Sequence, residues 1–303
     1  MSTVSTPTSL LRIADLTPRE LRQLLDLAAA MKDEPNGWHD ALAGASVACY
    51  FSKPSTRTRI SFEAAVHRLG GLPIMLRPDE LQLGRGEPIA DTARVMSSYC
   101  AAIVIRTFAQ SDVAEMAAAA SVPVINALTD DHHPCQALAD VLTLRERFGD
   151  LRGLPVAYVG DGNNVAHSLI EAAALTGIDL RLACPEGYGP DPDIASGTEV
   201  TDDPREAVAG ARAVYTDVWV SMGDEPEQQR RLRDLEDFRV TPGLMGVAAA
   251  DAIFLHCLPA HRGEEVATAV IDGAHSAVWQ QAANRLPTEQ AVLYALTTGD
   301  WEV

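Results

Sequence analysis

The chain has 303 residues and a formal net charge of -18. This excess of carboxylates repels nucleic acid and anionic membranes, so we expect neither as a partner. Hydrophobic residues make up 47% of the chain, and its length exceeds what one core usually covers, so two domains are expected. No run has membrane-spanning length, and residues 1–9 lack the pattern of a signal peptide, so the sequence predicts a cytoplasmic protein.

The first half of the chain alternates predicted strands with predicted helices. Thr17-Pro-Arg-Glu20 is a capping box that opens the first helix. Strands are expected at 47–51, 72–76, 101–106 and 122–127. Helices are expected at 60–69, 89–98, 112–120 and 135–148, with the apolar positions of the first of them at Ile60, Ala64, Ala65 and Leu69.

The second half repeats this alternation. Its strands are expected at 156–159, 180–184, 213–218 and 252–257, and its helices at 164–175, 204–209, 227–235 and 284–296. The repeated alternation predicts two parallel-sheet α/β domains with the active site in the cleft between them. We expect one domain at 1–148, joined by a C-terminal helix at about 284–303, and the other at 149–283.

Residues 55–59, Ser-Thr-Arg-Thr-Arg, directly follow the first predicted strand. Pro54 ends that strand, and Ser55 or Thr56 is a suitable N-cap for the helix that follows. Side chains on the first turn lie beside free backbone N–H groups and the positive end of the helix dipole. Such a turn can bind a phosphate or a carboxylate. The same spacing also fits an ordinary capped helix with solvated arginines.

The unusual polar residues of the chain fall at the carboxyl ends of predicted strands. Open α/β sheets bind ligands at this edge, so the shared placement is stronger evidence than any single motif. The residues in these positions are Arg57, Arg106, His132, His133 and Gln136 in the first half, and 160–164, 217–223 and 256–259 in the second.

Several of these motifs have a second interpretation. His133-Pro134 also fits a plain turn, and Cys257 also fits a core thiol. The segment 160–165 begins like a dinucleotide fingerprint, but Val165 replaces the third glycine and no acidic residue ends the next strand. We therefore expect no NAD.

The five cysteines have no metal-ligand spacing, so we expect no metal and no other cofactor. Cys49, Cys100 and Cys184 lie in or beside apolar runs and are expected to be reduced core residues. The glycine-rich segment 80–88 predicts either a surface loop or a lid. The acid-rich segment 224–237 predicts a solvated helix face.

Together these motifs resemble the aspartate/ornithine transcarbamoylase family. Ser55-Thr-Arg-Thr-Arg59 is similar to the family's carbamoyl phosphate signature, and His133-Pro-Cys-Gln136 to its second shared motif. Asp217-Val-Trp-Val-Ser-Met-Gly223 and His256-Cys-Leu-Pro259 resemble the ornithine branch rather than the aspartate branch. The resemblance runs from Leu16 to the last predicted helix. One departure is Ala283, which precedes Asn284-Arg285 where an acidic residue is common.

The resemblance implies transfer of a carbamoyl group from carbamoyl phosphate to the δ-amine of L-ornithine, in arginine biosynthesis. Arg57, Arg106 and His133 would polarise the carbonyl, and Gln136 would hold the carbamoyl amide. A homotrimer or an assembly of trimers is also implied, in which the loop with Gln82 enters a neighbouring subunit's site. The implied carbamoyl phosphate residues are Ser55, Thr56, Arg57, Thr58, Gln82, Arg106, His133, Gln136, Leu258 and Arg285.

For the amine substrate, the resemblance implies binding by Asn164, Asp217, Ser221 and Met222. Asp217 is the natural partner for the α-ammonium group. Cys257 is the expected catalytic residue for removing a proton from the attacking amine. Steering of that charge by Asp217 is an equal alternative.

Two other functions remain open. The chain could use another amine, such as putrescine, aspartate or an acylated ornithine, although Ser221-Met-Gly223 favours free ornithine. The chain could also be a non-enzymatic paralogue that binds or regulates. That interpretation predicts the loss of a phosphate or carbonyl contact, whereas the four residues expected to make those contacts are all present: Arg57, Arg106, His133 and Gln136.

Overall fold

The computed structural model describes residues 8–220 and 225–303. The chain forms two compact units, here called unit 1 (Met1–Leu138 with Asn284–Val303) and unit 2 (Ala139–Ala283). The division falls inside helix α5 (Pro134–Phe148), whereas the sequence places a domain boundary at the end of that helix. No helix among the described residues is long and apolar enough to cross a membrane.

Unit 1 contains a four-stranded parallel sheet with the strand order β2-β1-β3-β4. In the register of the sheet, Phe51 lies opposite Arg106, and Arg106 lies opposite Leu128. The carboxyl ends of three neighbouring strands therefore lie at one edge. The strands are β1 (Ser46–Phe51), β2 (Leu72–Leu76), β3 (Ala102–Arg106) and β4 (Val124–Leu128), as the sequence predicts within two residues.

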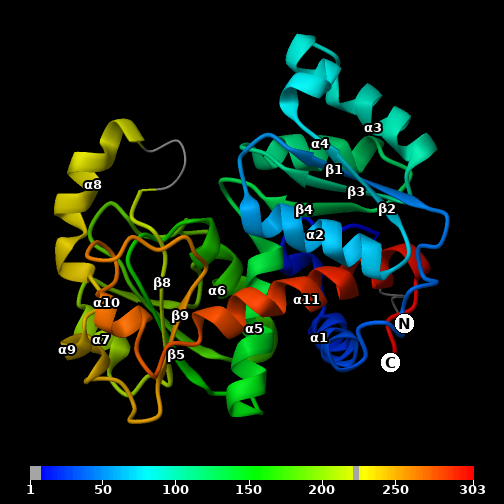
Figure 1. Cartoon of the computed structure of the whole chain (residues 1–303). Coiled ribbons are helices and arrows are strands. Elements are labelled where there is room, and N and C mark those ends of the chain that lie inside the picture. Colours follow the sequence, from blue (N-terminus) through cyan, green and yellow to red (C-terminus); the bar gives the residue numbers. More distant parts are fainter. Residues whose placement is uncertain (1–7, 221–224) are drawn as a thin grey trace. The chain divides into compact units, whose positions relative to one another are not determined.

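Helices cover both faces of this sheet. Side chains alternate between the faces of a strand, and Ala48 and Tyr50 point to the face where Met96 and Met116 pack. Figure 1 shows α3 and α4 on that face and α2 on the opposite one. The helices of this unit are α1 (Pro18–Asp33), α2 (Thr56–Arg68), α3 (Ile89–Tyr99), α4 (Gln110–Ala119), the start of α5 and the C-terminal part of α11 (Val278–Thr298).

The buried face of α2 does not include every apolar position that marks the helix in the sequence. Ile60 is 59% exposed, whereas Phe62, Ala65, Val66 and Leu69 are buried. Residues three, four and seven positions after Phe62 share one face of a helix, and Ile60 lies off that face. The buried stripe is therefore set by Phe62 rather than by Ile60.

Unit 2 contains a five-stranded parallel sheet with the order β7-β6-β5-β8-β9. The sequence predicts four of these strands, and the two predicted parallel-sheet α/β domains are confirmed. The edge strand β7 was not predicted, because its three partly exposed residues form no apolar run. The strands are β5 (Pro155–Val159), β6 (Asp179–Ala183), β7 (Glu199–Thr201), β8 (Ala213–Thr216) and β9 (Ile253–His256).

The helices of unit 2 include two of only four residues each, α9 (Pro242–Met245) and α10 (Thr268–Ile271), which were not predicted. Their residues pack with α7 (Pro204–Val208) against Val159 and Phe254 on one face of the sheet. Figure 1 shows α6 (Asn164–Thr176) on the other face. The acid-rich segment contains α8 (Gln228–Asp234).

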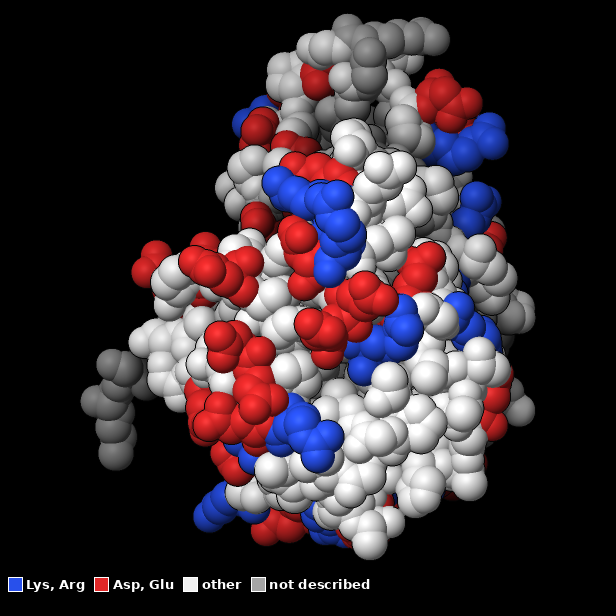
Figure 2. Space-filling view, turned by 90° about the vertical axis from the view of Figure 1, so that its left-hand side faces the viewer, with Lys and Arg blue, Asp and Glu red and all other residues white. Residues whose placement is uncertain are grey.

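Acidic side chains form several groups on the face drawn in Figure 2. Basic side chains lie beside these groups rather than in a continuous stripe. This distribution agrees with the net charge of -18 and lacks the basic stripe of a nucleic-acid-binding surface on the described part of that face.

Candidate active site

The first group of predicted site residues lies at the carboxyl edge of the sheet in unit 1. Arg57 follows β1, Arg106 ends β3, and His133 follows β4. Strands β1 and β4 both pair with β3, and all three are parallel. The fold therefore brings to one edge three residues that are far apart in the sequence.

Helix α2 begins at the segment that the sequence predicts to bind an anion. Ser55 is its N-cap, and the Ser55 hydroxyl accepts a hydrogen bond from the Thr58 backbone N–H at 3.3 Å. Thr58 is buried and Arg57 half-buried, whereas Thr56 and Arg59 are exposed. A capped helix start with a guanidinium beside it is a suitable place for a small anion.

His133 and Gln136, at the start of α5, are both buried. Burial lowers the pKa of His133 well below its ordinary value, and the positive charges of three arginines lower it further. His133 is therefore a neutral imidazole at pH 7, which can donate one N–H. The arginines that act on it, in order of effect, are Arg285, Arg106 and Arg57.

Arg285, on α11, contacts two other predicted carbamoyl phosphate residues. Its Nη1 donates to Gln136 Oε1 at 2.8 Å, and its Nη2 donates to Thr58 Oγ1 at 3.1 Å. The guanidinium also donates to Glu289 Oε1, from Nη2 at 2.6 Å and from Nε at 3.1 Å. We call Arg57, Arg106, His133, Gln136 and Arg285 the cationic cluster.

Two further polar residues of unit 1 lie in segments that follow β1 and β2. Lys53 is 4% exposed; its ammonium pairs with Asp130 and lies 4.2 Å from the centroid of the Phe108 ring. Gln82 is exposed and begins η3 (Gln82–Arg85), the second of two short 3₁₀ turns in the glycine-rich segment, after η2 (Pro78–Glu80).

The second group of predicted site residues lies at the carboxyl edge of the sheet in unit 2. Strand β5 leads into residues 160–164, β8 into Asp217 and β9 into Cys257, and β8 pairs with both of the other strands. Gly160 has a φ of 126°, and a Cβ on Gly162 would come within 2.3 Å of the Pro190 nitrogen. Both glycines are therefore required by the local backbone.

Asp217 is held by side chains that follow the two neighbouring strands. The Cys257 thiol donates to Asp217 Oδ1 at 2.6 Å, and Asn163 Nδ2 donates to Asp217 Oδ2 at 2.8 Å. Asn163 Oδ1 also caps α6, accepting two backbone N–H groups of its first turn at 2.9 and 3.3 Å. We call Asp217, Asn163 and Cys257 the Asp217 cluster.

The sequence names Asn164, not Asn163, for the amine side. Asn164 is half-buried and is the first residue of α6, next to the N-cap. Two adjacent asparagines before a helix do not reveal which of them is the cap, so the contact of Asn163 with Asp217 was missed. The predicted residues Ser221 and Met222 lie outside the described residues.

His256 fixes the turn that carries Cys257. Its backbone N–H donates to Gln281 Oε1 at 2.9 Å, and its Nδ1 accepts the Leu258 N–H at 2.9 Å. The ring proton is therefore on Nε2, which lies 3.1 Å from Glu265 Oε1. Leu258 has a φ of 59°, a left-handed conformation that costs energy for a branched side chain. Such strain is concentrated at functional turns.

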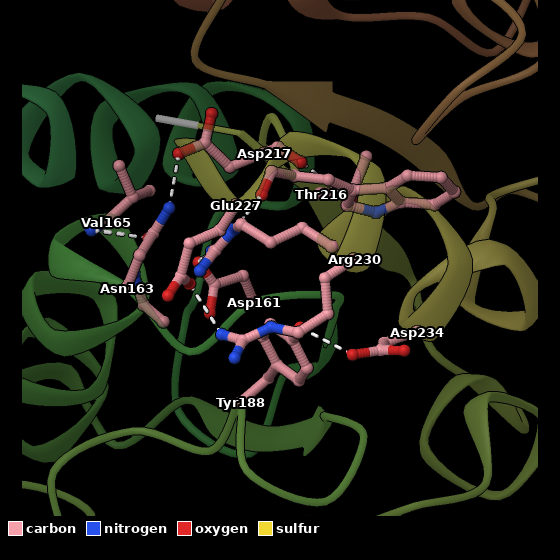
Figure 3. Close-up of polar contacts among 12 residues, drawn as sticks. Asp161, Asn163, Val165, Tyr188, Thr216, Asp217, Glu227, Arg230 and Asp234 are labelled. Atoms are coloured by element: carbon pink, nitrogen blue, oxygen red, sulfur yellow. Dashed lines mark hydrogen bonds and ion pairs between the residues drawn. The ribbon is translucent and has the colours of Figure 1, made fainter. Parts of the chain in front are cut away.

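A largely buried ion pair joins the turn after β5 to α8. Arg231 pairs with Asp161, and its Nε donates to the Trp219 carbonyl at 2.6 Å. The two charged side chains are 10% and 14% exposed. Figure 3 shows the Asn163 amide directed at Asp217, and Asp161 precedes Asn163 by two residues in the same turn. The prediction of a solvated helix face is therefore wrong for Arg231, because its long side chain turns inward to an acidic partner from the site.

Two sets of three side chains in the described part of the chain have potential metal-ligand atoms within 4.8 Å of one another. The sequence does not reveal them as metal-ligand spacings. In the first set both ring nitrogens of His256 already have partners, so this set fits a metal ion only if those contacts are lost. The sets are Asp217, His256 and Cys257, and His261, Glu264 and Glu265.

Two domain models of one family match nearly the whole chain. The model described as "aspartate/ornithine carbamoyltransferase, carbamoyl-P binding domain" matches residues 8–146. The model described as "Asp/Orn binding domain" of the same family matches residues 152–296. The cationic cluster, except Arg285, falls in the first match and the Asp217 cluster in the second.

Similar proteins carry the same description. An ornithine carbamoyltransferase of Listeria monocytogenes is 50% identical, covering 95% of each chain, and one of Acidothermus cellulolyticus is 51% identical, covering 92% of this chain and 93% of that one. The structure of the Pyrococcus furiosus enzyme gives a TM-score of 0.91 at 47% identity, covering 96% and 97%, and that of Thermus thermophilus gives 0.90 at 44%, covering 96% and 99%. The chain belongs to the aspartate/ornithine carbamoyltransferase family.

Proposed function

We propose that the protein transfers the carbamoyl group of carbamoyl phosphate to the δ-amine of L-ornithine, giving L-citrulline and phosphate. The observation that carries this proposal is the pairing of two sites of opposite charge. The cationic cluster suits a phosphorylated acyl donor, and the Asp217 cluster suits a cationic amino acid. The names of the relatives, all ornithine carbamoyltransferases, support the choice of amine.

Carbamoyl phosphate binds with its phosphate at the start of α2 in this proposal. The first-turn N–H groups, the hydroxyls of Ser55, Thr56 and Thr58, and the guanidinium of Arg57 supply donors to the phosphate oxygens. Arg106 and Arg285 add positive charge, and Gln82 and Leu258 complete the proposed set. The hydrogen bonds from Arg285 to Thr58 and Gln136 support a common ligand for these residues.

The carbonyl carbon becomes reactive when charge on its oxygen is stabilised. Arg57, Arg106 and His133 are the proposed donors, and Gln136 holds the carbamoyl amide. A neutral His133 can donate to the oxygen without competing with the arginines for the phosphate. Loss of one such donor typically costs about 3 kcal/mol of activation free energy. Phosphate is a good leaving group, so the attack needs no covalent intermediate.

L-Ornithine binds through the Asp217 cluster, with Asp217 receiving the α-ammonium group. Asn163 holds the carboxylate of Asp217 in place, and Asn164, Ser221 and Met222 complete the proposed set. The amine must lose a proton before it attacks. We assign that step to the Cys257–Asp217 pair, whose hydrogen bond can pass a proton between sulfur and carboxylate. Direct attack also requires the two bound substrates to meet.

The proposal includes a cytoplasmic homotrimer, or an assembly of trimers, that serves arginine biosynthesis. Exposed apolar side chains on unit 1 support an interface there: Ile60 is 59% exposed, Leu72 60% and Tyr99 75%. In such an assembly we propose that Gln82, which is exposed, reaches a neighbouring subunit's site. A light-scattering mass that is not a multiple of three chains would exclude it, and cell fractionation tests the location.

The direct test is citrulline formation from carbamoyl phosphate and L-ornithine by the purified protein. We expect turnover with ornithine that exceeds turnover with putrescine or aspartate. The Arg57→Ala variant is expected to remain folded and to lose at least about 100-fold in kcat/KM, because it loses a donor to both the phosphate and the carbonyl. Faster turnover with putrescine than with ornithine would overturn the substrate assignment. Full activity in Arg57→Ala would overturn the position of the phosphate site.

A further inference from the structure

Glu289 is a buried acidic residue next to the cationic cluster. Its side chain is 0% exposed, and its Oε1 accepts both hydrogen bonds from the inner edge of the Arg285 guanidinium. Nη2, which also bonds Glu289, donates to Thr58, and Nη1 donates to Gln136. One guanidinium therefore joins a buried carboxylate to two residues of the proposed carbamoyl phosphate site.

These contacts fix the conformation of the Arg285 side chain before any ligand binds. A free arginine side chain has roughly 2 kcal/mol of rotamer entropy, and a site that orders it beforehand spares the ligand that cost. The carboxylate also lowers the positive charge that an incoming phosphate meets. The ordering of Arg285 and the lowered positive charge both reach the substrate through Arg285, so Glu289 need not contact the substrate itself.

We propose that Glu289 is a positioning residue of the carbamoyl phosphate site, which holds the Arg285 guanidinium against Thr58 and Gln136 and moderates the charge of the cationic cluster. This inference rests on the proposed function for the identity of the ligand. The position of Glu289, one helical turn after Arg285, is what allows the pair to form.

The pair also makes anion binding depend on pH. Burial raises the pKa of Glu289 to about 7, although Arg285 and the Ser61 hydroxyl on α2 lower it in part. Near pH 7 the carboxyl is therefore about half protonated. A bound anion favours the neutral carboxylic acid, so linkage requires the affinity for an anion to rise as the pH falls through 7.

Three other titratable side chains of this region stay neutral in this range. Burial and the charge of Glu289 raise the pKa of Cys49 on β1 and of Cys135 on α5, so both thiols stay neutral. His133 also stays neutral, because its pKa is well below the ordinary value. Glu63 on α2 is the further carboxylate that acts on Cys49, and it serves as a matched control.

The test uses sulfate, a dianion that does not titrate between about pH 6 and 8, with the full-length protein and calorimetry. Wild type is expected to bind sulfate up to about 5-fold more tightly at pH 6 than at pH 8, from a pKa change of up to about one unit on binding. Glu289→Gln removes the titrating group but keeps a hydrogen-bond acceptor. The affinity of this variant for sulfate should therefore differ by less than about twofold between the two pH values. Glu63→Gln should keep the wild-type dependence.

A second variant tests the positioning role. Glu289→Ala releases Arg285, so the KM for carbamoyl phosphate should rise about tenfold at every pH, with kcat changed by less than about threefold. Glu289→Gln should restore most of that loss. Wild-type pH dependence in Glu289→Gln, or an unchanged KM in Glu289→Ala, would overturn the inference. Sulfate binding needs no turnover, so a wild type that binds sulfate as described but forms no citrulline contradicts only the proposed function.

Discussion

Cys257 and Asp217 show how one hydrogen bond constrains the chemistry of the amine. The thiol donates to the carboxylate, so the sulfur holds its proton before a substrate binds. A cationic amino acid that pairs with Asp217 competes for the same carboxylate. The thiol proton can move to the Asp217 carboxylate as the sulfur takes a proton from the amine, so the net transfer is one proton from the amine to Asp217. We therefore assign the proton step to both residues together.

Replacing Cys257 by serine tests this assignment. Serine keeps a donor to Asp217 but holds its proton much more tightly than a thiol, so kcat should fall about 10- to 100-fold. The KM for carbamoyl phosphate should not change. Steady-state rates over a range of pH measure both effects. Cys100→Ser, at a half-buried cysteine of unit 1, is the matched control, and equal effects of the two substitutions would contradict the role of Cys257.

At the scale of single residues, the sequence predicts those site residues that belong to short, continuous motifs. Ser55, Arg57 and His133 lie in short motifs directly after strands, where a side chain and the backbone form one site. Asn163 and Glu289 were not predicted, because their roles arise from contacts with residues that are far away in the sequence or that lie on a helix with no distinctive pattern. Such contacts depend on packing, which local patterns do not encode.

Helix α8 illustrates the same limit at the scale of an element. Its position and most of its length follow from the sequence, but the acid-rich composition of the surrounding segment conceals that Arg231 turns inward to Asp161. The short elements α9, α10 and β7 also escape prediction, because three or four residues cannot display a period. Helix α11 begins at Val278, earlier than expected, and it continues through Pro287.

Removal of Arg231 should therefore affect unit 2 more than an ordinary surface substitution does. Arg231→Met leaves Asp161 buried without its partner, which typically costs about 3 kcal/mol or more of unfolding free energy. Because Asp161 lies in the turn that carries Asn163, the KM for ornithine should also rise while that for carbamoyl phosphate stays constant. Thermal unfolding and steady-state rates measure these changes.

Arg230→Met is the matched control for that prediction. Arg230 lies next to Arg231 on α8, and its ion pair with Glu227 is exposed on both sides, at 56% and 49%. Exposed pairs contribute little, so this variant should keep wild-type stability and both KM values. Loss of stability in Arg230→Met equal to that in Arg231→Met would contradict the structural role of the Asp161 pair.

At the scale of the whole molecule, the two units place their proposed sites in the same way. The proposed site of unit 1 suits an anion, and that of unit 2 suits a cation. Each unit has a parallel sheet, and each places polar residues at the carboxyl ends of three neighbouring strands: β1, β3 and β4 in unit 1, and β5, β8 and β9 in unit 2. The sequence predicts these positions because the polar motifs directly follow the predicted strands and therefore lie at the carboxyl edge of each sheet. In a chain with a net charge of -18, Arg57, Arg106 and Arg285 all act on the buried His133 in unit 1.

The central claim is that these two clusters act on substrates that meet. The most direct measurement is the affinity, by calorimetry, of one compound that joins a phosphonate to an ornithine-like amino acid through a carbamoyl-like link. Arg57→Ala and Asp217→Asn should each weaken its binding by roughly 10- to 150-fold, the usual range for a lost hydrogen bond to a charged group. Methylphosphonate alone should respond only to Arg57→Ala. Unchanged binding of the joined compound in Asp217→Asn would contradict the account.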